Sequence, residues 1–347
     1  MTSDDTTDLL LSRLEGNPVA LLNFARTFLL AKGREREARE VCERVLAASP
    51  HDPELAALAR SVIGHGIGSW YFTMVQDVNR HALYERALKA ALVKGGRVLD
   101  IGAGTGLFAM LAARCGADEV IACEQNPAIA DAVRDTVAAN GLSDRVKVVA
   151  KLSTDLQLGV DMQGPADVVI WDNLANNLIA QGATKAVDDA KRRLAVPAAP
   201  FIPSRAEIML ALAHDLKPEN RQMMIVDGFD LSAFNRFAPS GYTKQQPSVA
   251  LRSESRTIFD FDFQSGSYPP ERGAVSLTAS GGQVDGLIQW VRFHLGHGIV
   301  YDTLDETAHA FGLEFHGVTP IDTVPGQAIE AGGRHDGQST WFWLERR

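Results

Sequence analysis

The segment Val98–Phe108, with the sequence VLDIGAGTGLF, restricts the possible folds of this chain more than any other stretch. It begins as an apolar run typical of a buried strand, passes through Gly102, Gly104 and Gly106, and continues into an apolar helical pattern. Glycine tolerates the backbone angles of a tight turn and lets the main chain approach a ligand closely. The first amides of a following helix point at such a ligand because they have no partner within the helix. The segment therefore predicts a strand, a turn and a helix that together bind a nucleotide-shaped molecule.

Strands and helices alternate on both sides of this segment. The pattern continues as a strand (EVIACE), a helix (PAIADAVRDTVAANG) and two further strands (RVKVVA and ADVVIWD). A helical pattern from Ser69 to the Gly95-Gly96 pair precedes it. Alternation at this spacing favours a parallel sheet with crossover helices. We predict an α/β doubly wound, Rossmann-like domain over residues 65–197, including the preceding helix.

The segments before and after this domain have different sequence patterns. Residues 1–64 show two apolar helical repeats, which weakly resemble a tetratricopeptide repeat; a packed helical cap and a peptide-docking module both remain open. Residues 198–347 consist of short, often alternating apolar runs separated by Gly, Pro and Ser, which predicts an antiparallel β-barrel-like domain for substrate binding or dimerisation. Within it, residues 217–245 have weak periodicity and are the candidate for a dimer arm.

The charge and composition exclude several classes of protein. The formal net charge is −9, whereas nucleic-acid binders carry basic surfaces, so we expect no nucleic-acid partner. No apolar stretch is long enough for a membrane span, and the N-terminus has no basic export signal, so we expect no membrane partner. The three cysteines lack disulfide or metal-ligand spacing, which indicates a cytoplasmic protein without a metal.

Two acidic residues narrow the choice of ligand at the glycine turn. Asp100 lies just before the first glycine of the turn. Glu124 follows the next strand, where a carboxylate can bind both hydroxyls of a ribose. A dinucleotide would place its pyrophosphate beside Asp100, and the spacing here is G-x-G-x-G rather than the usual G-x-G-x-x-G. S-adenosylmethionine carries a sulfonium and no phosphate, so an acid favours it. We expect S-adenosylmethionine as cofactor, with a dinucleotide as the weaker alternative.

With these residues in view, the chain resembles the protein arginine methyltransferases through VLDIGAGTGL, YFTMVQDVNR, KLSTDLQLG and WDNLANNLIAQGA. The resemblance implies an S-adenosylmethionine-dependent methyltransferase that forms a homodimer. It also implies that Arg80 pairs with the donor's carboxylate, that Met74 packs near the sulfonium, and that Glu124 binds the ribose. The remaining residues that it places around the cofactor are Asp100, Gly102, Gly104, Gly106, Leu107, Leu152, Ser153 and Asp172.

The chain departs from the family pattern where the acceptor should bind. The family holds the acceptor guanidinium between two glutamates, because paired carboxylates accept its forked donors. Here Asp172 stands at the first of these positions and Gln181 at the second. The family's Thr-His-Trp loop corresponds by this comparison to Ile288, Gln289 and Trp290, and its histidine would couple to the counterpart of Asp77.

These departures leave three interpretations open. The chain transfers a methyl group to a nitrogen of arginine in a peptide, protein or small molecule, through an altered pocket. Alternatively it methylates another acceptor, such as an amine, amide, imidazole or carboxylate. The third hypothesis is a non-catalytic protein that binds S-adenosylmethionine and docks a partner.

Overall fold

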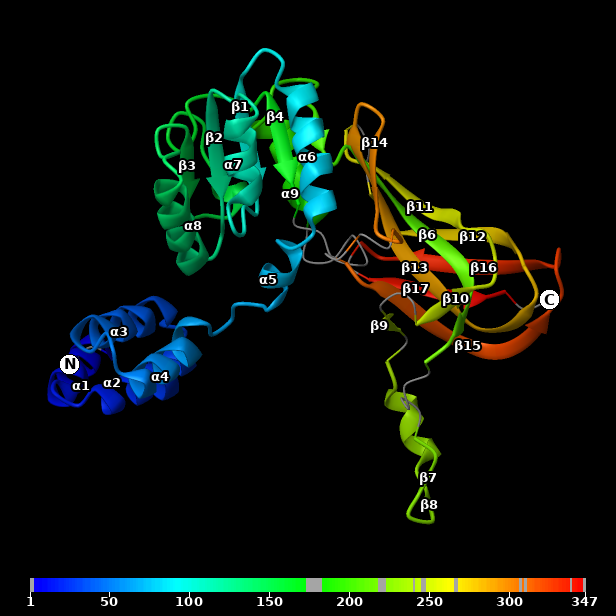
Figure 1. The fold of residues 1–347 in the computed structure, drawn as a ribbon, viewed down its shortest axis with the longest axis horizontal. Helices are drawn as coiled ribbons and strands as arrows, with labels where there is room; N and C mark the ends of the chain where they lie inside the picture. Colours follow the sequence, from blue (N-terminus) through cyan, green and yellow to red (C-terminus); the bar gives the residue numbers. More distant parts are fainter. Residues whose placement is uncertain are drawn as a thin grey trace. The chain divides into compact units, whose positions relative to one another are not determined.

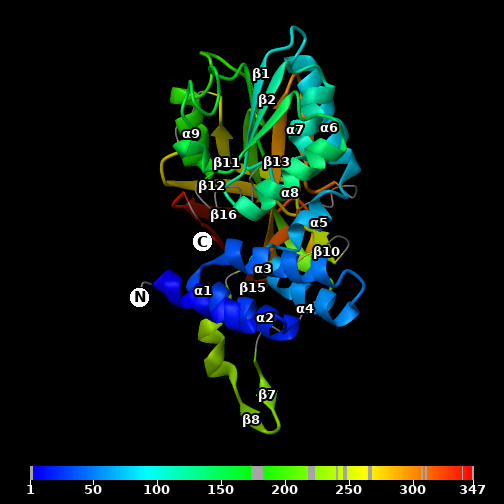
Figure 2. The ribbon, with the colours of Figure 1, turned by 90° about the vertical axis from the view of Figure 1, so that its left-hand side faces the viewer.

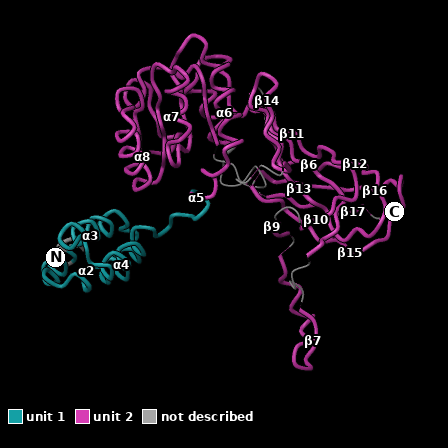
Figure 3. Tube along the Cα trace, in the orientation of Figure 1, with its two compact units in different colours: residues 1–71 teal, residues 72–347 magenta. Residues whose placement is uncertain are grey.

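The chain divides into two compact units, residues 1–71 and 72–347 (Figure 3). The computed structural model describes residues 3–172, 183–217, 223–239, 241–244, 248–264, 268–305, 308, 311–337 and 339–345. No helix in these ranges is long and apolar enough to cross a membrane.

The first unit is helical. Its elements are α1 (Ser3–Leu14), α2 (Pro18–Phe24), the π-helical and 3-10 turns Ala25–Leu29 and Leu30–Lys32, α3 (Glu35–Ala48) and α4 (Pro53–Ile63). The chain turns between α2 and α3 at Gly33, whose φ of 68° is left-handed. Asp52 caps α4 by accepting hydrogen bonds from the amides of Glu54 and Leu55, at 2.9 and 3.1 Å. The helices bury a core of their own that includes Leu22, Leu29 and Val41, as expected for paired helices.

The boundary between the two units falls within the helical segment that leads into the sheet. The sequence pattern suggested one continuous helix, but the structure has two, α5 (Trp70–Met74) and α6 (Val78–Ala91). The break occurs because Asp77 caps α6: its Oδ1 atom accepts a hydrogen bond from the amide of Arg80 at 2.9 Å. A side chain that satisfies a free amide of the first turn starts a new helix there.

A parallel five-stranded sheet follows, in the order β3-β2-β1-β4-β5 (Figures 1 and 2). The strands are β1 (Arg97–Ile101), β2 (Glu119–Cys123), β3 (Val146–Val149), β4 (Val168–Trp171) and β5 (Phe201–Ile202). The connecting helices are α7 (Leu107–Arg114), α8 (Pro127–Ala139), the 3-10 turn Ser153–Asp155 and α9 (Ala183–Arg193). The strand order reverses between β1 and β4, so a ligand crevice is expected at their carboxyl ends.

Antiparallel strands form the rest of the second unit. One sheet runs β10-β6-β13-β15-β9, with β11 paired to β6 and β14 paired to β13, and a second runs β12-β16-β17. Their bounds are β6 (Arg205–Asp215), β9 (Tyr242–Lys244), β10 (Val249–Leu251), β11 (Arg256–Asp262), β12 (Glu271–Thr278), β13 (Gly282–Gly296), β14 (Ile299–Asp302), β15 (Leu313–Thr323), β16 (Ala328–His335) and β17 (Thr340–Leu344). This confirms the α/β sheet followed by an antiparallel domain.

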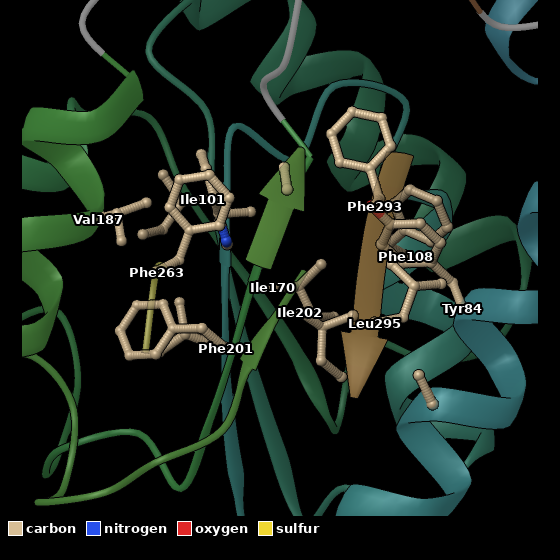
Figure 4. Close-up of a cluster of buried hydrophobic side chains, with 14 of the residues drawn as sticks. Tyr84, Ile101, Phe108, Ile170, Val187, Phe201, Ile202, Phe263, Phe293 and Leu295 are labelled. Carbon is tan, nitrogen blue, oxygen red and sulfur yellow. The ribbon is translucent and has the colours of Figure 1, made fainter. Parts of the chain in front are cut away.

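The parallel sheet and the antiparallel strands share one hydrophobic core. Figure 4 shows Phe201 and Ile202 of β5, Phe108 of α7 and Phe293 of β13 in this cluster. The shared core fixes the carboxyl ends of the parallel strands against the antiparallel strands β6 and β9–β17, called the barrel below, so residues from both contribute to one site.

An extension leaves the barrel between β6 and β9 and ends in the small hairpin of β7 (Ile225–Val226) and β8 (Phe229–Asp230) (Figure 1). The 3-10 turn Ser232–Phe237 follows it. The extension exposes large apolar side chains, of which those more than half exposed are Met224, Ile225, Val226, Phe229, Phe234 and Phe237.

Candidate active site

The strand register brings the predicted site residues that follow three strands to the same edge of the sheet. Ile101 at the end of β1 pairs with Cys123 of β2 and with Trp171 of β4. The residues that follow these three strand ends therefore lie side by side: the glycine turn, Glu124 and Asp172.

The glycine turn has the backbone that its sequence predicted. The φ angles of Gly102, Gly104 and Gly106 are 74°, 54° and 77°, all in the left-handed region. A Cβ atom on Gly106 would lie 2.7 Å from Cγ1 of Val133, so glycine is also needed for the approach of α8. Leu107, another predicted cofactor residue, is the first residue of α7.

Glu124 is buried directly beneath this turn. Its Oε2 atom accepts a hydrogen bond from the amide of Gly104 at 3.1 Å, and its Oε1 atom accepts one from the amide of Asn126 at 2.8 Å. Only 4% of Glu124 is exposed. The carboxylate is thus fixed at the crevice by two backbone groups.

Asp100 is the second acid beside the turn, and it is 2% exposed. Burial, aided by the charge of Glu124, raises the pKa of Asp100 to about 7. Its Oδ2 atom has no hydrogen-bond partner within the described part of the chain. A buried polar atom without a partner is uncommon, and a cationic ligand at this position would satisfy it.

Arg80 of α6 extends into the same region from the other side. Its guanidinium carbon lies 5.6, 4.9 and 5.8 Å from the ring centres of Tyr84, Phe108 and Phe311. Burial lowers the pKa of Arg80, although the nearby Tyr84, Tyr301 and Asp77 act in the opposite direction. Its Nη2 atom forms an ion pair with Oδ2 of Asp172, and its Nε atom has no hydrogen-bond partner among the described residues.

Asp172 follows β4 and is held on both oxygens. Besides the ion pair with Arg80, its Oδ1 atom accepts a hydrogen bond from the hydroxyl of Tyr84 at 2.7 Å. The side chain of Asp172 is 9% exposed. The arrangement is a nearly buried carboxylate whose direction is set by two partners on α6.

Asp77 lies at the start of α6 and is fully buried. Its Oδ2 atom accepts a hydrogen bond from the hydroxyl of Tyr301 at 2.6 Å, while its Oδ1 atom caps α6. The barrel strand β14 is therefore joined directly to the helix that carries Arg80.

The other predicted cofactor residues lie on the segments next to these. Met74 ends α5, and its carbonyl oxygen accepts a hydrogen bond from the amide of Asp77 at 3.4 Å. Leu152 is 50% exposed and Ser153 is 7% exposed, at the start of the 3-10 turn after β3. Lys151 holds this segment in place through hydrogen bonds of 2.7 and 2.9 Å to Asp161.

The structure does not place Gln289 and Trp290 as the sequence comparison suggested. Both are buried inside the long central strand β13 rather than in a loop. The Oε1 atom of Gln289 is bonded to His316 at 3.1 Å and to Thr340 at 3.2 Å. Trp290 packs in a separate cluster with residues such as Phe315. Asp77 accepts a hydrogen bond from the barrel residue Tyr301, and the coupling of Asp77 to the position of the family's histidine stays a prediction.

Gln181, the predicted second acceptor residue, lies outside the described residues. Sequence reasoning also missed Tyr84, Tyr301, Phe108 and Phe311. Tyr84 stands one helical turn after Arg80, so the period of α6 could have revealed it. The contact of Tyr301 depends on a pairing between distant segments that no local pattern signals.

The parallel sheet, the glycine turn and the acid after β2 together define a Rossmann-like, class I methyltransferase fold. A family model for ribosomal protein L11 methyltransferase (PrmA) matches residues 82–199. Among solved structures, the Trypanosoma brucei PRMT1 enzyme-prozyme heterotetrameric complex with AdoHcy aligns over 77% of this chain and 86% of its own, with a TM-score of 0.66 and 22% identity. Arabidopsis thaliana protein arginine methyltransferase 10 aligns over 78% and 96%, with a TM-score of 0.62 and 18% identity. These two structures support the fold.

Curated relatives identify the family. An arginine N(omega)-methyltransferase of Streptomyces achromogenes subsp. streptozoticus is 31% identical over 298 residues, which cover 84% of this chain and 82% of that protein. Protein arginine N-methyltransferase 7 of Drosophila grimshawi is 41% identical over 139 residues, 38% of this chain. The matched part is only 20% of that longer protein. The chain belongs to the arginine N-methyltransferase family and is an S-adenosylmethionine-dependent enzyme.

Proposed function

We propose that this enzyme transfers a methyl group from S-adenosylmethionine to an ω-nitrogen of an arginine guanidinium, with Asp172 as the acceptor carboxylate. One observation carries the proposal: Asp172 already pairs with a guanidinium, that of Arg80, at the carboxyl end of β4. The Streptomyces relative, named for the same reaction, supports it.

We also propose a donor position, which the unpaired atoms of the site support. When bound, S-adenosylmethionine supplies a methyl group on a positively charged sulfur. Glu124 binds the ribose and Asp100 faces the donor's cationic end. The Nε atom of Arg80, which has no partner among the described residues, binds the donor's carboxylate. Met74 packs near the sulfur, and Leu152 and Ser153 line the adenine.

Asp172 would act by binding the acceptor and directing one of its nitrogens. A guanidinium is a weak nucleophile while its charge is delocalised, and a carboxylate draws that charge toward one side. A carboxylate has lone pairs for about four hydrogen bonds, so Asp172 can accept from Tyr84, Arg80 and an acceptor at once. Gln181 would add a hydrogen bond but no charge.

The acceptor class is tested with labelled donor and separate acceptors: free L-arginine, an arginine peptide, and the same peptide with lysine or histidine in place of arginine. We expect label only in the arginine samples, and loss of transfer in Asp172→Asn. An effective dielectric near 20 makes one carboxylate about 4 Å from a cation worth up to ~4 kcal/mol, roughly a thousandfold in rate. Asp189→Asn is the matched control, because Asp189 of α9 is also a half-buried carboxylate that pairs with an arginine, Arg193.

A second acceptor class remains a candidate because Asp172 and Gln181 depart from the paired glutamates of the family. Label in the lysine or histidine peptide, with none in the arginine samples, would replace arginine by that acceptor. Membership in a family of enzymes argues against a non-catalytic protein that only binds S-adenosylmethionine.

We further propose a cytoplasmic homodimer in which the extension contacts a second copy. The extension exposes 71% of Phe229 and 73% of Ile225, and apolar patches of this kind mark interfaces. In sedimentation experiments, Phe229→Asp should be monomeric, whereas Val324→Asp, 65% exposed in a barrel turn, should stay dimeric. A monomeric wild type would refute the dimer. The cysteines Cys42, Cys115 and Cys123 are free, as suits the cytoplasm.

A further inference from the structure

The hydroxyl of Tyr301 connects the barrel to the residue that starts the donor-binding helix. It donates a 2.6 Å hydrogen bond to Oδ2 of Asp77, and the two residues are 224 positions apart in the sequence. The Oδ1 atom of the same carboxylate accepts from the amide of Arg80. One carboxylate thus fixes the backbone of Arg80 from within α6 and is itself held from β14.

We propose that Tyr301 is a positioning residue for the methyl donor: through Asp77 it holds the first turn of α6 so that Arg80 faces the donor's carboxylate. The inference rests on the proposed donor position. It assigns no chemical step to Tyr301, which acts only by fixing the direction of Arg80.

The packing around Tyr301 suits this role. Tyr301 is 1% exposed, and its ring lies 6.1 Å from that of Phe293 at an interplanar angle of 11°. Phe311 touches both ends of the arrangement, 6.3 Å from the Tyr301 ring and 5.8 Å from the guanidinium carbon of Arg80. Since the ring is fixed on these sides, its hydroxyl has a fixed direction toward Asp77.

The protonation state of the phenol agrees with a donor role. Burial and the neighbouring Asp77 raise the pKa of Tyr301, so its hydroxyl stays protonated at neutral pH. A neutral hydroxyl that donates to a buried carboxylate stabilises the charged form of that carboxylate. Contacts between α6 and the barrel strands β13 and β14 make this connection part of a wider interface rather than an isolated bond.

The test uses Tyr301→Phe, which removes the hydroxyl and keeps the ring. Hydrogen bonds to charged groups contribute enough that we expect S-adenosylhomocysteine to bind about tenfold more weakly by calorimetry. The KM for the donor should rise by a similar factor, while the KM for the acceptor at saturating donor stays within about twofold. Tyr268→Phe is the matched control, because it also loses one hydrogen bond, 3.0 Å to the carbonyl oxygen of Asp262.

Two further variants separate the outcomes. Arg80→Met should weaken S-adenosylhomocysteine binding, and adding Tyr301→Phe to it should cost little more, because both act on the same contact. If Arg80→Met binds like the wild type, the proposed donor position fails. If Arg80→Met binds weakly while Tyr301→Phe binds like the wild type, or if the two effects add fully, the positioning role of Tyr301 fails. Thermal unfolding of each variant establishes that it is folded.

Discussion

Tyr84 and Asp172 are joined by a 2.7 Å hydrogen bond across 88 positions of the sequence. Tyr84 comes from α6 and Asp172 from the end of β4, so the bond connects the helix over the crevice with the sheet beneath it. The ring of Tyr84 is stacked on Phe108 with their centres 4.3 Å apart, as the close-up of the core in Figure 4 illustrates. The direction of Asp172, the proposed acceptor carboxylate, is therefore set by a side chain whose own position is fixed by packing.

Tyr84→Phe should lower kcat without weakening donor binding. The variant removes the hydroxyl that orients Asp172 and keeps the stacked ring, so among the described residues the carboxylate keeps its ion pair with Arg80 as its one remaining contact. Loss of one buried hydrogen bond to a charged group predicts a kcat about tenfold lower, with S-adenosylhomocysteine affinity within about twofold of wild type. Steady-state kinetics and calorimetry measure the two. Wild-type turnover would show that Asp172 does not depend on Tyr84.

Glu124→Gln should weaken donor binding more than it affects folding. The amide keeps the size of the side chain but can accept hydrogen bonds on one oxygen only, whereas Glu124 accepts from the amides of Gly104 and Asn126 and is the residue proposed to bind the ribose. We expect the affinity for S-adenosylhomocysteine to fall at least tenfold. Glu119→Gln is the control, because Glu119 begins the strand that Glu124 follows and is paired with Arg97. Equal affinity in both variants would remove Glu124 from the ribose site.

Much of the donor side of this site follows from local sequence, because one strand, one turn and one helix carry it. The glycine spacing and the position of Glu124 after the next strand are short patterns whose geometry is determined within a few residues. The acceptor side is not local. Strand length and register in the barrel decide which residues reach the crevice, and β13 buries both Gln289 and Trp290.

The helix break before α6 illustrates the same limit. The apolar pattern from Trp70 to Ala91 fits one helix, and only the capping contact of Asp77 with the Arg80 amide divides it. An aspartate within a helical pattern is ambiguous, since it can lie on an exposed face or start a new helix. Tyr301 resolves this in the structure by fixing Asp77 from the barrel.

Gly106→Ala should destabilise the protein for two separable reasons. A side chain at a φ of 77° costs about 1–2 kcal/mol, and the new Cβ would lie 2.7 Å from Cγ1 of Val133, which adds about 1–3 kcal/mol. Gly116→Ala has a φ of 106° and no atom within 4 Å of its Cβ, so it measures the backbone cost alone. Adding Val133→Ala to Gly106→Ala should remove part of the clash and so recover part of the lost free energy of unfolding, measured by chemical denaturation. No relief would mean that the turn, rather than the α8 contact, requires glycine.

The raised pKa of Asp100 predicts a pH dependence in both folding and donor binding. The carboxyl has a pKa of about 7 in the folded protein and 3.8 as its ordinary value, so the folded state holds the proton more tightly than the unfolded state. Asp100 therefore contributes most to stability below about pH 4, and this contribution is lost as the pH rises toward 7, by up to about 1.4 kcal/mol per pH unit. Comparing denaturation of wild type and Asp100→Asn between pH 4 and 8 isolates this contribution, because asparagine does not titrate.

A cationic donor favours the ionised carboxylate of Asp100, so S-adenosylmethionine should bind the wild type more tightly as the pH rises through 7. The proton released on binding is detectable by calorimetry in buffers of different ionisation enthalpy. If wild type and Asp100→Asn show parallel stability profiles and no proton is released on binding, Asp100 is not the residue that faces the donor's charge.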